Sequence, residues 1–195
     1  MIDMRYLLER VRKIASELKE NVYTNKLDIT QYKYKEGNFL GINSVNEDTS
    51  EWIDFDSNKE MWGGIDHKHF WFRTSVEVPK EFDGKVLALD ICAVEEGWDA
   101  VNPQFILYVN GEHIQGLDIN HREVILTHNA KAGDVYQIDL HSYTGRTYNT
   151  KLNLKSRLIT IDLQTRELYF NLQVPIWSCE KLDSDDKRRI DMVMV

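Results

Sequence analysis

The sequence predicts a mainly β protein, an antiparallel jelly-roll β-sandwich flanked by an N-terminal helix and C-terminal helices. Hydrophobic residues in the first two dozen positions recur three and four apart, which is the spacing of one helix face. From there to about residue 161, short alternating runs are separated by turn signals, as in strands. Helical spacing then returns. We therefore expect an amphipathic helix at 1–24, a sandwich at 25–161 and a helical segment at 162–195.

The first helix is predicted from a continuous apolar stripe. Its members are Met4, Leu7, Leu8, Val11, Ile14, Ala15, Leu18 and Val22. Charged residues occupy the other positions, so the helix is amphipathic and should bury the stripe against another part of the fold. The period breaks at 21–25, where we expect the helix to end.

The strands are predicted from alternation and from the turns between them. The expected strands are 29–35, 70–78, 85–91, 104–109, 123–126, 135–143 and 152–161. Asn110-Gly111 is the strongest hairpin signal, because a type I′ turn needs positive φ at both central residues. No helical pattern interrupts the series, and such a run of short strands is typical of a sandwich.

The C-terminal part is predicted to be helical again. Asp162 can cap a helix that Pro175 should kink or divide. A fresh helix start follows Leu182, and the chain stops within an apolar run, 190–195. We expect Val195 to be the cut edge of a longer polypeptide. The alternative is a short natural helix whose last residues tuck into the core.

Composition excludes several classes of protein. The 195 residues are 42% hydrophobic and 11% aromatic, which is unlike a disordered or fibrous chain. The net charge is −8, with no basic block, which argues against nucleic acid or an anionic membrane as partner. No apolar run approaches the roughly 20 residues of a membrane-spanning helix. The first residues are charged and amphipathic, so we expect no secretory signal. We expect a cytoplasmic protein.

The common catalytic motifs do not occur. Gly-x-Ser-x-Gly, His-Glu-x-x-His, the P-loop and Gly-x-Gly-x-x-Gly are all missing. His67 and His69 could share one strand face and one metal, but no further ligand lies nearby, so we interpret them as polar residues at a strand edge. Trp98, among acidic residues at 95–99, could stack on a sugar. The alternative is a solvated acidic loop with one anchoring aromatic.

The most informative stretch is 102–124, NPQFILYVNGEHIQGLDINHREV. A hairpin on Asn110-Gly111 is followed by a polar cluster of Asp118, Asn120, His121 and Arg122. Side chains crowded in this way either hold a loop by hydrogen bonds or face a partner. The residues alone leave both interpretations open.

This stretch resembles the N-terminal β-sandwich of cytosolic and vacuolar-type α-mannosidases of glycoside hydrolase family 38. Trp62-Gly-Gly before FWFRTSVEVP at 70–79 is similar to the opening strand of that domain, and the helical segments 1–24 and 163–172 are similar to those that flank it. The strand and hairpin are also generic to galactose-binding-like sandwiches of many glycosidases, whereas 102–124 is more particular.

The resemblance implies an enzyme that hydrolyses terminal α-mannosides with retention. Its zinc ion and its Asp nucleophile belong to a downstream catalytic domain that opens with Gly-His-x-His-x-Asp-x-x-Trp. This chain contains no His-x-Asp, so no catalytic residue is carried over. The resemblance therefore implies no cofactor in this chain, zinc in the missing domain, and no activity for the chain alone.

The favoured hypothesis is a non-catalytic domain that packs on the catalytic domain of the same polypeptide through its helices and the loop near Asp118. Asp118, Asn120, His121 and Arg122 should then share one exposed face, where they brace that domain or border its substrate pocket. A free-standing carbohydrate-binding module acting through Trp98 is an alternative. Others are the sugar-binding domain of a β-galactosidase or β-glucuronidase, and a small metal enzyme built on the histidine pair. Homo-oligomers remain open.

Overall fold

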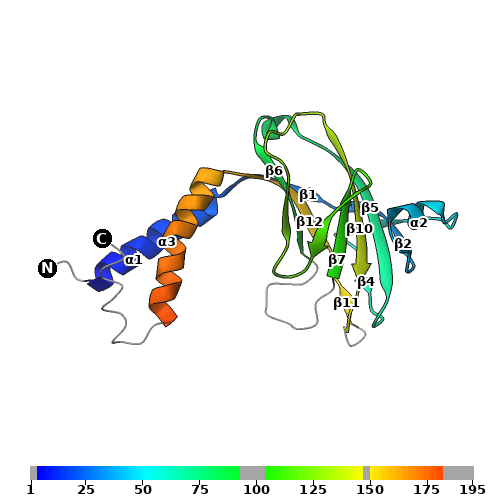
Figure 1. The fold of residues 1–195 in the computed structure, drawn as a ribbon, viewed down its shortest axis with the longest axis horizontal. Coiled ribbons are helices and arrows are strands. Elements are labelled where there is room, and N and C mark those ends of the chain that lie inside the picture. The colour runs from blue at the N-terminus through cyan, green and yellow to red at the C-terminus, as the bar shows by residue number, and fades with distance from the viewer. Residues whose placement is uncertain (1–3, 93–103, 147–149, 182–195) are drawn as a thin grey trace. The chain divides into compact units, whose positions relative to one another are not determined.

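A computed structural model describes residues 4–92, 104–146 and 150–181. The chain forms two compact units. One combines residues 1–24 with 161–195, and the other is residues 25–160 (Figure 1).

The larger unit is an antiparallel β-sandwich, which confirms the predicted fold class. One sheet has the order β1-β12-β6-β9. These strands are β1 (Tyr23–Ile29), β12 (Lys155–Ile161), β6 (Val86–Cys92) and β9 (Glu123–Thr127). The other sheet has the order β3-β2-β5-β10-β7-β8. Its strands are β3 (Ile53–Asp56), β2 (Gln31–Glu36), β5 (His69–Glu77), β10 (Val135–Tyr143), β7 (Gln104–Val109) and β8 (Glu112–Leu117).

A short two-stranded ribbon forms a third sheet. It pairs β4 (Trp62–Gly63) with β11 (Lys151–Leu152). The predicted strand at 152–161 is therefore two strands, β11 and β12, and not one. β3, β4 and β8 lie outside the predicted strands, and so does β1 except for Ile29.

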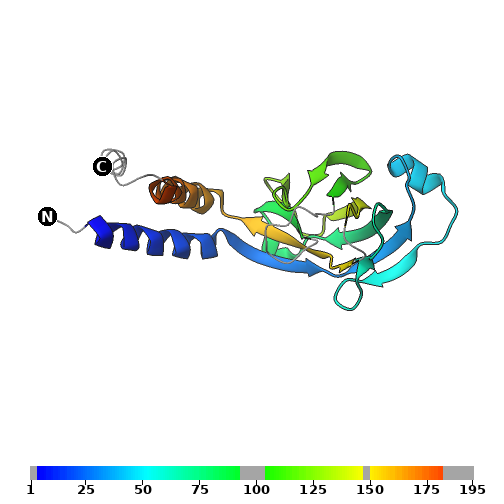
Figure 2. The same cartoon turned by 90° about the horizontal axis from the view of Figure 1, so that it is seen from below.

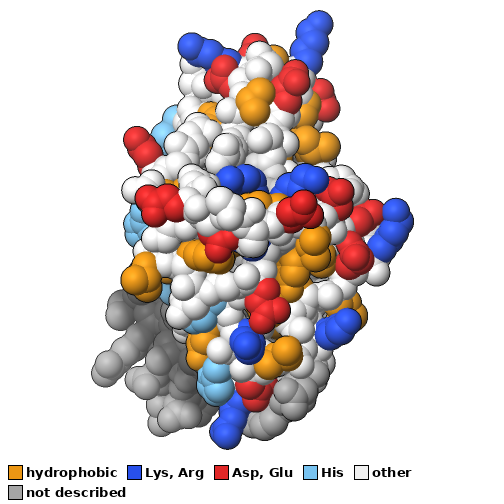
Figure 3. Space-filling model, turned by 90° about the vertical axis from the view of Figure 1, so that its right-hand side faces the viewer, with side chains coloured by type: hydrophobic (Ala, Val, Ile, Leu, Met, Phe, Trp, Pro, Cys, Tyr) orange, Lys and Arg blue, Asp and Glu red, His pale blue; other side chains and the backbone are white. Residues whose placement is uncertain are grey.

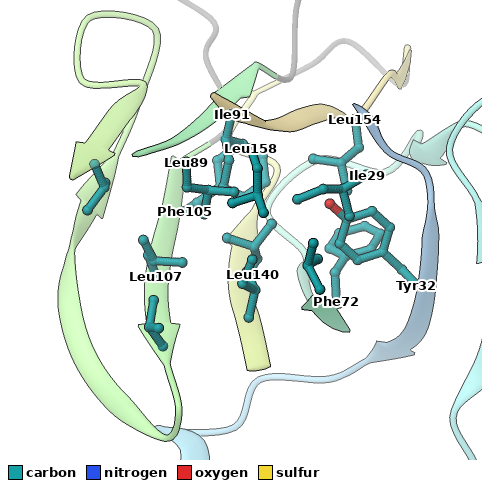
Figure 4. Close-up of a cluster of buried hydrophobic side chains, with 14 of the residues drawn as sticks. Ile29, Tyr32, Phe72, Leu89, Ile91, Phe105, Leu107, Leu140, Leu154 and Leu158 are labelled. Carbon is teal, nitrogen blue, oxygen red and sulfur yellow. The ribbon is translucent and has the colours of Figure 1, made fainter. Parts of the chain in front are cut away.

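The core lies between the two large sheets. Alternate residues of each strand point inward, as the period of two requires. The side chains that meet there come from both sheets (Figure 4), and those labelled are Ile29, Tyr32, Phe72, Leu89, Ile91, Phe105, Leu107, Leu140, Leu154 and Leu158. The Tyr32 hydroxyl is satisfied inside this core by a short hydrogen bond with the Ser156 hydroxyl.

The predicted hairpin at Asn110-Gly111 is confirmed. Asn110 has φ 52° and Gly111 has φ 83°, the two positive values of a type I′ turn. The Asn110 side chain also accepts a hydrogen bond from the Gln137 N–H at 2.9 Å. The turn joins β7 to β8, which is an edge strand of the six-stranded sheet.

Part of the outer face of the six-stranded sheet is covered by a short helix, α2 (Ile42–Glu47), and the chain around it. No helix was expected here. The buried Lys35 of β2 donates to the Asp48 and Ser50 carbonyls and pairs with the Asp48 carboxylate at 2.8 Å. That pairing is the main reason why the pKa of Asp48 falls to about 2. Figure 3 looks onto this side and shows acidic, basic and hydrophobic side chains interspersed.

The smaller unit is a pair of helices, α1 (Met4–Asn21) and α3 (Leu163–Lys181), which lie side by side (Figures 1 and 2). Asp162 caps α3 as predicted, because its carboxylate accepts the Thr165 N–H at 2.9 Å. Pro175 does not divide α3, which is continuous through it. The further helix expected after Leu182 lies outside the described residues.

The pair leaves many large apolar side chains exposed, including Tyr6, Ile14, Leu168, Phe170, Val174 and Trp177. The predicted stripe on α1 is thus only partly buried: Ala15 is covered, whereas Ile14 is 46% exposed. Within the described ranges, no helix has the length and apolar character needed to cross a membrane.

Candidate functional site

The predicted polar cluster falls into two parts. Asp118, Asn120 and His121 form the tight connection between β8 and β9. One Asp118 carboxylate oxygen accepts the backbone N–H groups of Asn120 and His121, both at 2.8 Å, and lies 2.9 Å from the His121 Nδ1 atom. Of the two interpretations left open by the sequence, the loop-holding one is observed for these three residues. Asn120 and His121 are also exposed.

Partial burial raises the pKa of the Asp118 carboxyl, but the hydrogen bonds from Asn120 and His121 outweigh burial, so its pKa lies below the ordinary value. Asp118→Ala should lower the free energy of unfolding by about 1 kcal/mol, because charge-accepting hydrogen bonds are lost at a partly exposed site. It should also speed hydrogen exchange at the 120 and 121 amides. Glu112→Ala, at an exposed position of β8, is the matched control. Unchanged exchange in the Asp118 variant would contradict this role.

Arg122 belongs to a different group of side chains. Its Nη2 atom lies 3.5 Å from the Asp90 carboxylate, and the same carboxylate accepts a hydrogen bond from Arg157 Nε at 2.9 Å. Asp90 and Arg157 come from the neighbouring strands β6 and β12. Leu89, Ile91 and Leu158 point into the core, so alternation turns Asp90 and Arg157 to the outer face of the four-stranded sheet. The Arg122 side chain therefore contacts a different group from Asp118, Asn120 and His121.

This group lines an open pocket of about 930 Å³. The sheet contributes Asp28, Asp90, Lys155 and Arg157 to its wall, beside Arg122. The connections contribute Ser57, Asn58 and Asn153. Most of these groups are hydrogen-bond donors or acceptors, so the pocket suits a polar ligand.

The sequence analysis missed Asp90, Lys155 and Arg157. A signal was available, because a charged residue between Leu89 and Ile91, and two more before Leu158, occupy the outward positions of predicted strands. What the sequence could not give is the strand order that brings β6 beside β12.

The two histidines proposed as a metal pair are not equivalent. His67 lies before β5 with φ 56° and contacts the Tyr143 hydroxyl through Nδ1 at 2.6 Å. His69 instead contacts His141 of β10, with 3.0 Å between the ring nitrogens. The shared strand face is therefore wrong, since only His69 is in the strand. In the described part of the chain, no three His, Cys, Asp or Glu side chains gather as metal ligands, so these residues do not fit a zinc centre.

The partly buried His141 should make the stability of the fold depend on pH. Its ring stacks on Trp71 at 4.6 Å, and burial, with repulsion from His69, lowers the pKa of His141 from 6.5 to about 4. The unfolded chain therefore binds a proton near pH 6.5 while the folded one stays neutral. The free energy of unfolding should therefore have its highest value above pH 6.5 and should fall as the pH drops toward 4.

The test is urea unfolding between pH 7.5 and 5. His141→Gln should flatten the decline between pH 6.5 and 5, whereas His128→Gln should leave it unchanged, because His128 is exposed. An equally steep decline in the His141 variant would contradict the assignment.

Trp98, the predicted sugar-stacking residue, lies outside the described residues. No family model and no curated protein sequence matches the chain.

Among solved structures, similar chains include β-glucuronidase from Ruminococcus gnavus. Its complex with D-glucaro 1,5-lactone has TM-score 0.48 and 13% identity, covering 71% of this chain and 29% of that chain. Its apo structure has TM-score 0.47 and 14% identity with the same coverage. The complex with D-glucuronic acid has TM-score 0.46 and 13% identity, with 71% and 30% covered. The match thus spans less than a third of those enzymes, and function has to be inferred from this chain's own residues.

Proposed function

We propose that this chain is a non-catalytic accessory domain of a glycosidase, and specifically of a cytoplasmic, zinc-dependent α-mannosidase. The observation that carries the proposal is the stretch 102–124, whose described part, 104–124, builds β7, the edge strand β8 and the Asp118 loop. The most particular part of the family resemblance thus forms one continuous segment that includes a sandwich edge. Edge strands and loops are where a domain is open to a neighbour.

One feature supports a neighbouring catalytic domain in the same polypeptide. The helix pair α1–α3 keeps large apolar side chains such as Val174 and Trp177 about half exposed, and clustered exposed apolar groups mark interaction surfaces. In this proposal the Asp118 loop braces that domain and takes no part in hydrolysis.

The gene should be read for about 100 codons beyond Val195. We expect a Gly-His-x-His-x-Asp-x-x-Trp motif there. The complete gene product should hydrolyse p-nitrophenyl α-mannoside, and EDTA should abolish that activity. The 195-residue chain should show none. A stop codon, a different catalytic motif, or hydrolysis of p-nitrophenyl β-galactoside or β-glucuronide in its place would overturn the α-mannosidase assignment.

Sugar binding by the domain itself is a second candidate, favoured by the polar pocket of about 930 Å³ around Asp90. Hydroxyl-rich ligands need several donors and acceptors on one wall, and the pocket provides them. The candidate does not require a catalytic domain.

A further inference from the structure

The arginine pair of the pocket, Arg122 and Arg157, has N–H groups that the Asp90 carboxylate does not use. Asp90 bridges Arg122 and Arg157, but Arg157 uses only Nε at 2.9 Å and Arg122 is 3.5 Å away. Both Nη groups of Arg157 have no partner in the described part of the chain. A guanidinium in this state can bind an oxyanion through two parallel N–H groups, the strongest geometry available to arginine.

One donor in this group is both buried and unpaired. The Arg122 Nε atom is inaccessible to solvent and has no hydrogen-bond partner among the described residues. A buried donor without a hydrogen-bond partner destabilises the folded chain and is rare enough to require a cause. A ligand that carries a hydrogen-bond acceptor next to the arginine pair would provide that cause, because it would draw the Arg122 guanidinium toward it.

The charge of the pocket favours an anion. Three cationic side chains, Arg122, Lys155 and Arg157, face the carboxylates of Asp28 and Asp90. Positive charge is therefore in excess locally, although the whole chain carries −8. Lys155 is exposed and forms no ion pair in the described ranges. An anionic ligand group thus finds a cationic site within an acidic protein.

The other polar residues of the pocket wall suit a ligand that carries several hydroxyl groups. Ser57, Asn58 and Asn153 offer hydroxyl and amide groups, and Asp28 offers an acceptor. The volume, about 930 Å³, lies within the roughly 300–1,000 Å³ of small-molecule sites. We propose that the pocket binds an acidic sugar, a small polyol carrying one carboxylate or phosphate group that Arg157 and Lys155 hold. This inference rests on the sugar-binding candidate and is independent of the α-mannosidase assignment.

Isothermal titration of the 195-residue chain tests it with two matched pairs, glucuronate against glucose and mannose 6-phosphate against mannose. Inorganic phosphate is the fifth probe. We expect at least one acidic sugar to bind ten times more tightly than its neutral partner and than inorganic phosphate. The acidic sugar that binds more tightly shows whether the pocket prefers a carboxylate or a phosphate group.

Variants locate the site. Lys155→Gln, which breaks no ion pair of the described residues, and Arg157→Gln should each weaken binding of the acidic sugar at least fivefold. Lys131→Gln removes the same charge at an exposed position outside the pocket and should leave binding unchanged. The Lys155 variant keeps the test valid if the Arg157 variant unfolds.

Three results would overturn the inference. The first is no acidic sugar binding at millimolar concentration, and the second is equal weakening by Lys131→Gln. The third is neutral sugars binding as tightly as acidic ones. That last result would retain the sugar-binding candidate while rejecting this ligand class, so the two fail separately. None of these results bears on the motif expected beyond Val195.

Discussion

Asp139→Ala should lower the free energy of unfolding by about 3–5 kcal/mol, the range measured when one partner of a buried ion pair is removed. The Asp139 carboxylate is fully buried on β10. It accepts a short hydrogen bond from Arg73 Nε and one from Gln137 Nε2 at 2.8 Å. Its loss leaves the Arg73 guanidinium, which is only 26% exposed, facing an apolar methyl group. Guanidinium chloride unfolding at pH 7 gives the value.

The chain contains a matched control for this experiment. Lys33 and Asp54 form an ion pair of 2.6 Å in the same sheet, but their side chains are 54% and 87% exposed. Asp54→Ala should change stability by less than about 1 kcal/mol, because solvent screens such pairs. Similar losses in both variants would show that burial does not set the energy of the Arg73–Asp139 pair. Arg73→Met combined with Asp139→Leu should recover most of the loss, because it leaves no unpaired charge.

The sequence predicted strands well where alternation is long. β5 and β10 each have nine residues, enough for the period of two to be read directly, and Phe70, Phe72 and Val76 point inward as that period requires. Turn chemistry also worked at Asn110, where a side-chain acceptor and positive φ coincide. These signals are local, so the sequence contains all that is needed to recognise them.

Two of the missed elements are short. α2 has six residues and β4 has two, too few for a hydrophobic pattern to repeat several times. They are fixed by distant contacts: Trp62 of β4 by aromatic side chains of β5 and β7, and the chain near α2 by the buried Lys35. A buried lysine cannot be recognised from its neighbours in sequence, because its burial depends on carbonyl groups more than ten residues away.

The candidate site shows the same limit. Proximity in sequence grouped Arg122 with Asp118, but the two side chains belong to different clusters. Asp118 binds groups two and three residues away, so its role was within reach of sequence reasoning. Arg122 lies beside Asp90, and that carboxylate also binds Arg157, 67 residues further along the chain. Only the order of strands in the sheet brings these three together.

Trp62→Ala should lower the free energy of unfolding by about 3–5 kcal/mol, as large aromatic-to-alanine changes in cores do. Trp62 is 2% exposed. Its ring centroid lies 5.5 Å from Phe70, 5.4 Å from Phe72 and 5.7 Å from Phe105. The variant would leave a cavity between three rings that β-strands hold in place, so the site cannot collapse easily. Trp177→Ala, at a half-exposed helix position, should change stability by less than about 1 kcal/mol.

Trp62→Phe separates packing from hydrogen bonding at this position. It keeps an aromatic ring but removes the indole N–H, which donates to the Asn153 carbonyl at 3.3 Å. Asn153 belongs to the wall of the pocket. Loss of this hydrogen bond should therefore make that part of the wall more mobile. We expect a stability loss of about 1–2 kcal/mol from the smaller ring and the missing bond. A decrease in acidic-sugar affinity should accompany it. If Trp62→Phe lowered stability as much as Trp62→Ala, packing alone would not account for the role of Trp62. Unchanged affinity would show that the pocket wall does not depend on this bond.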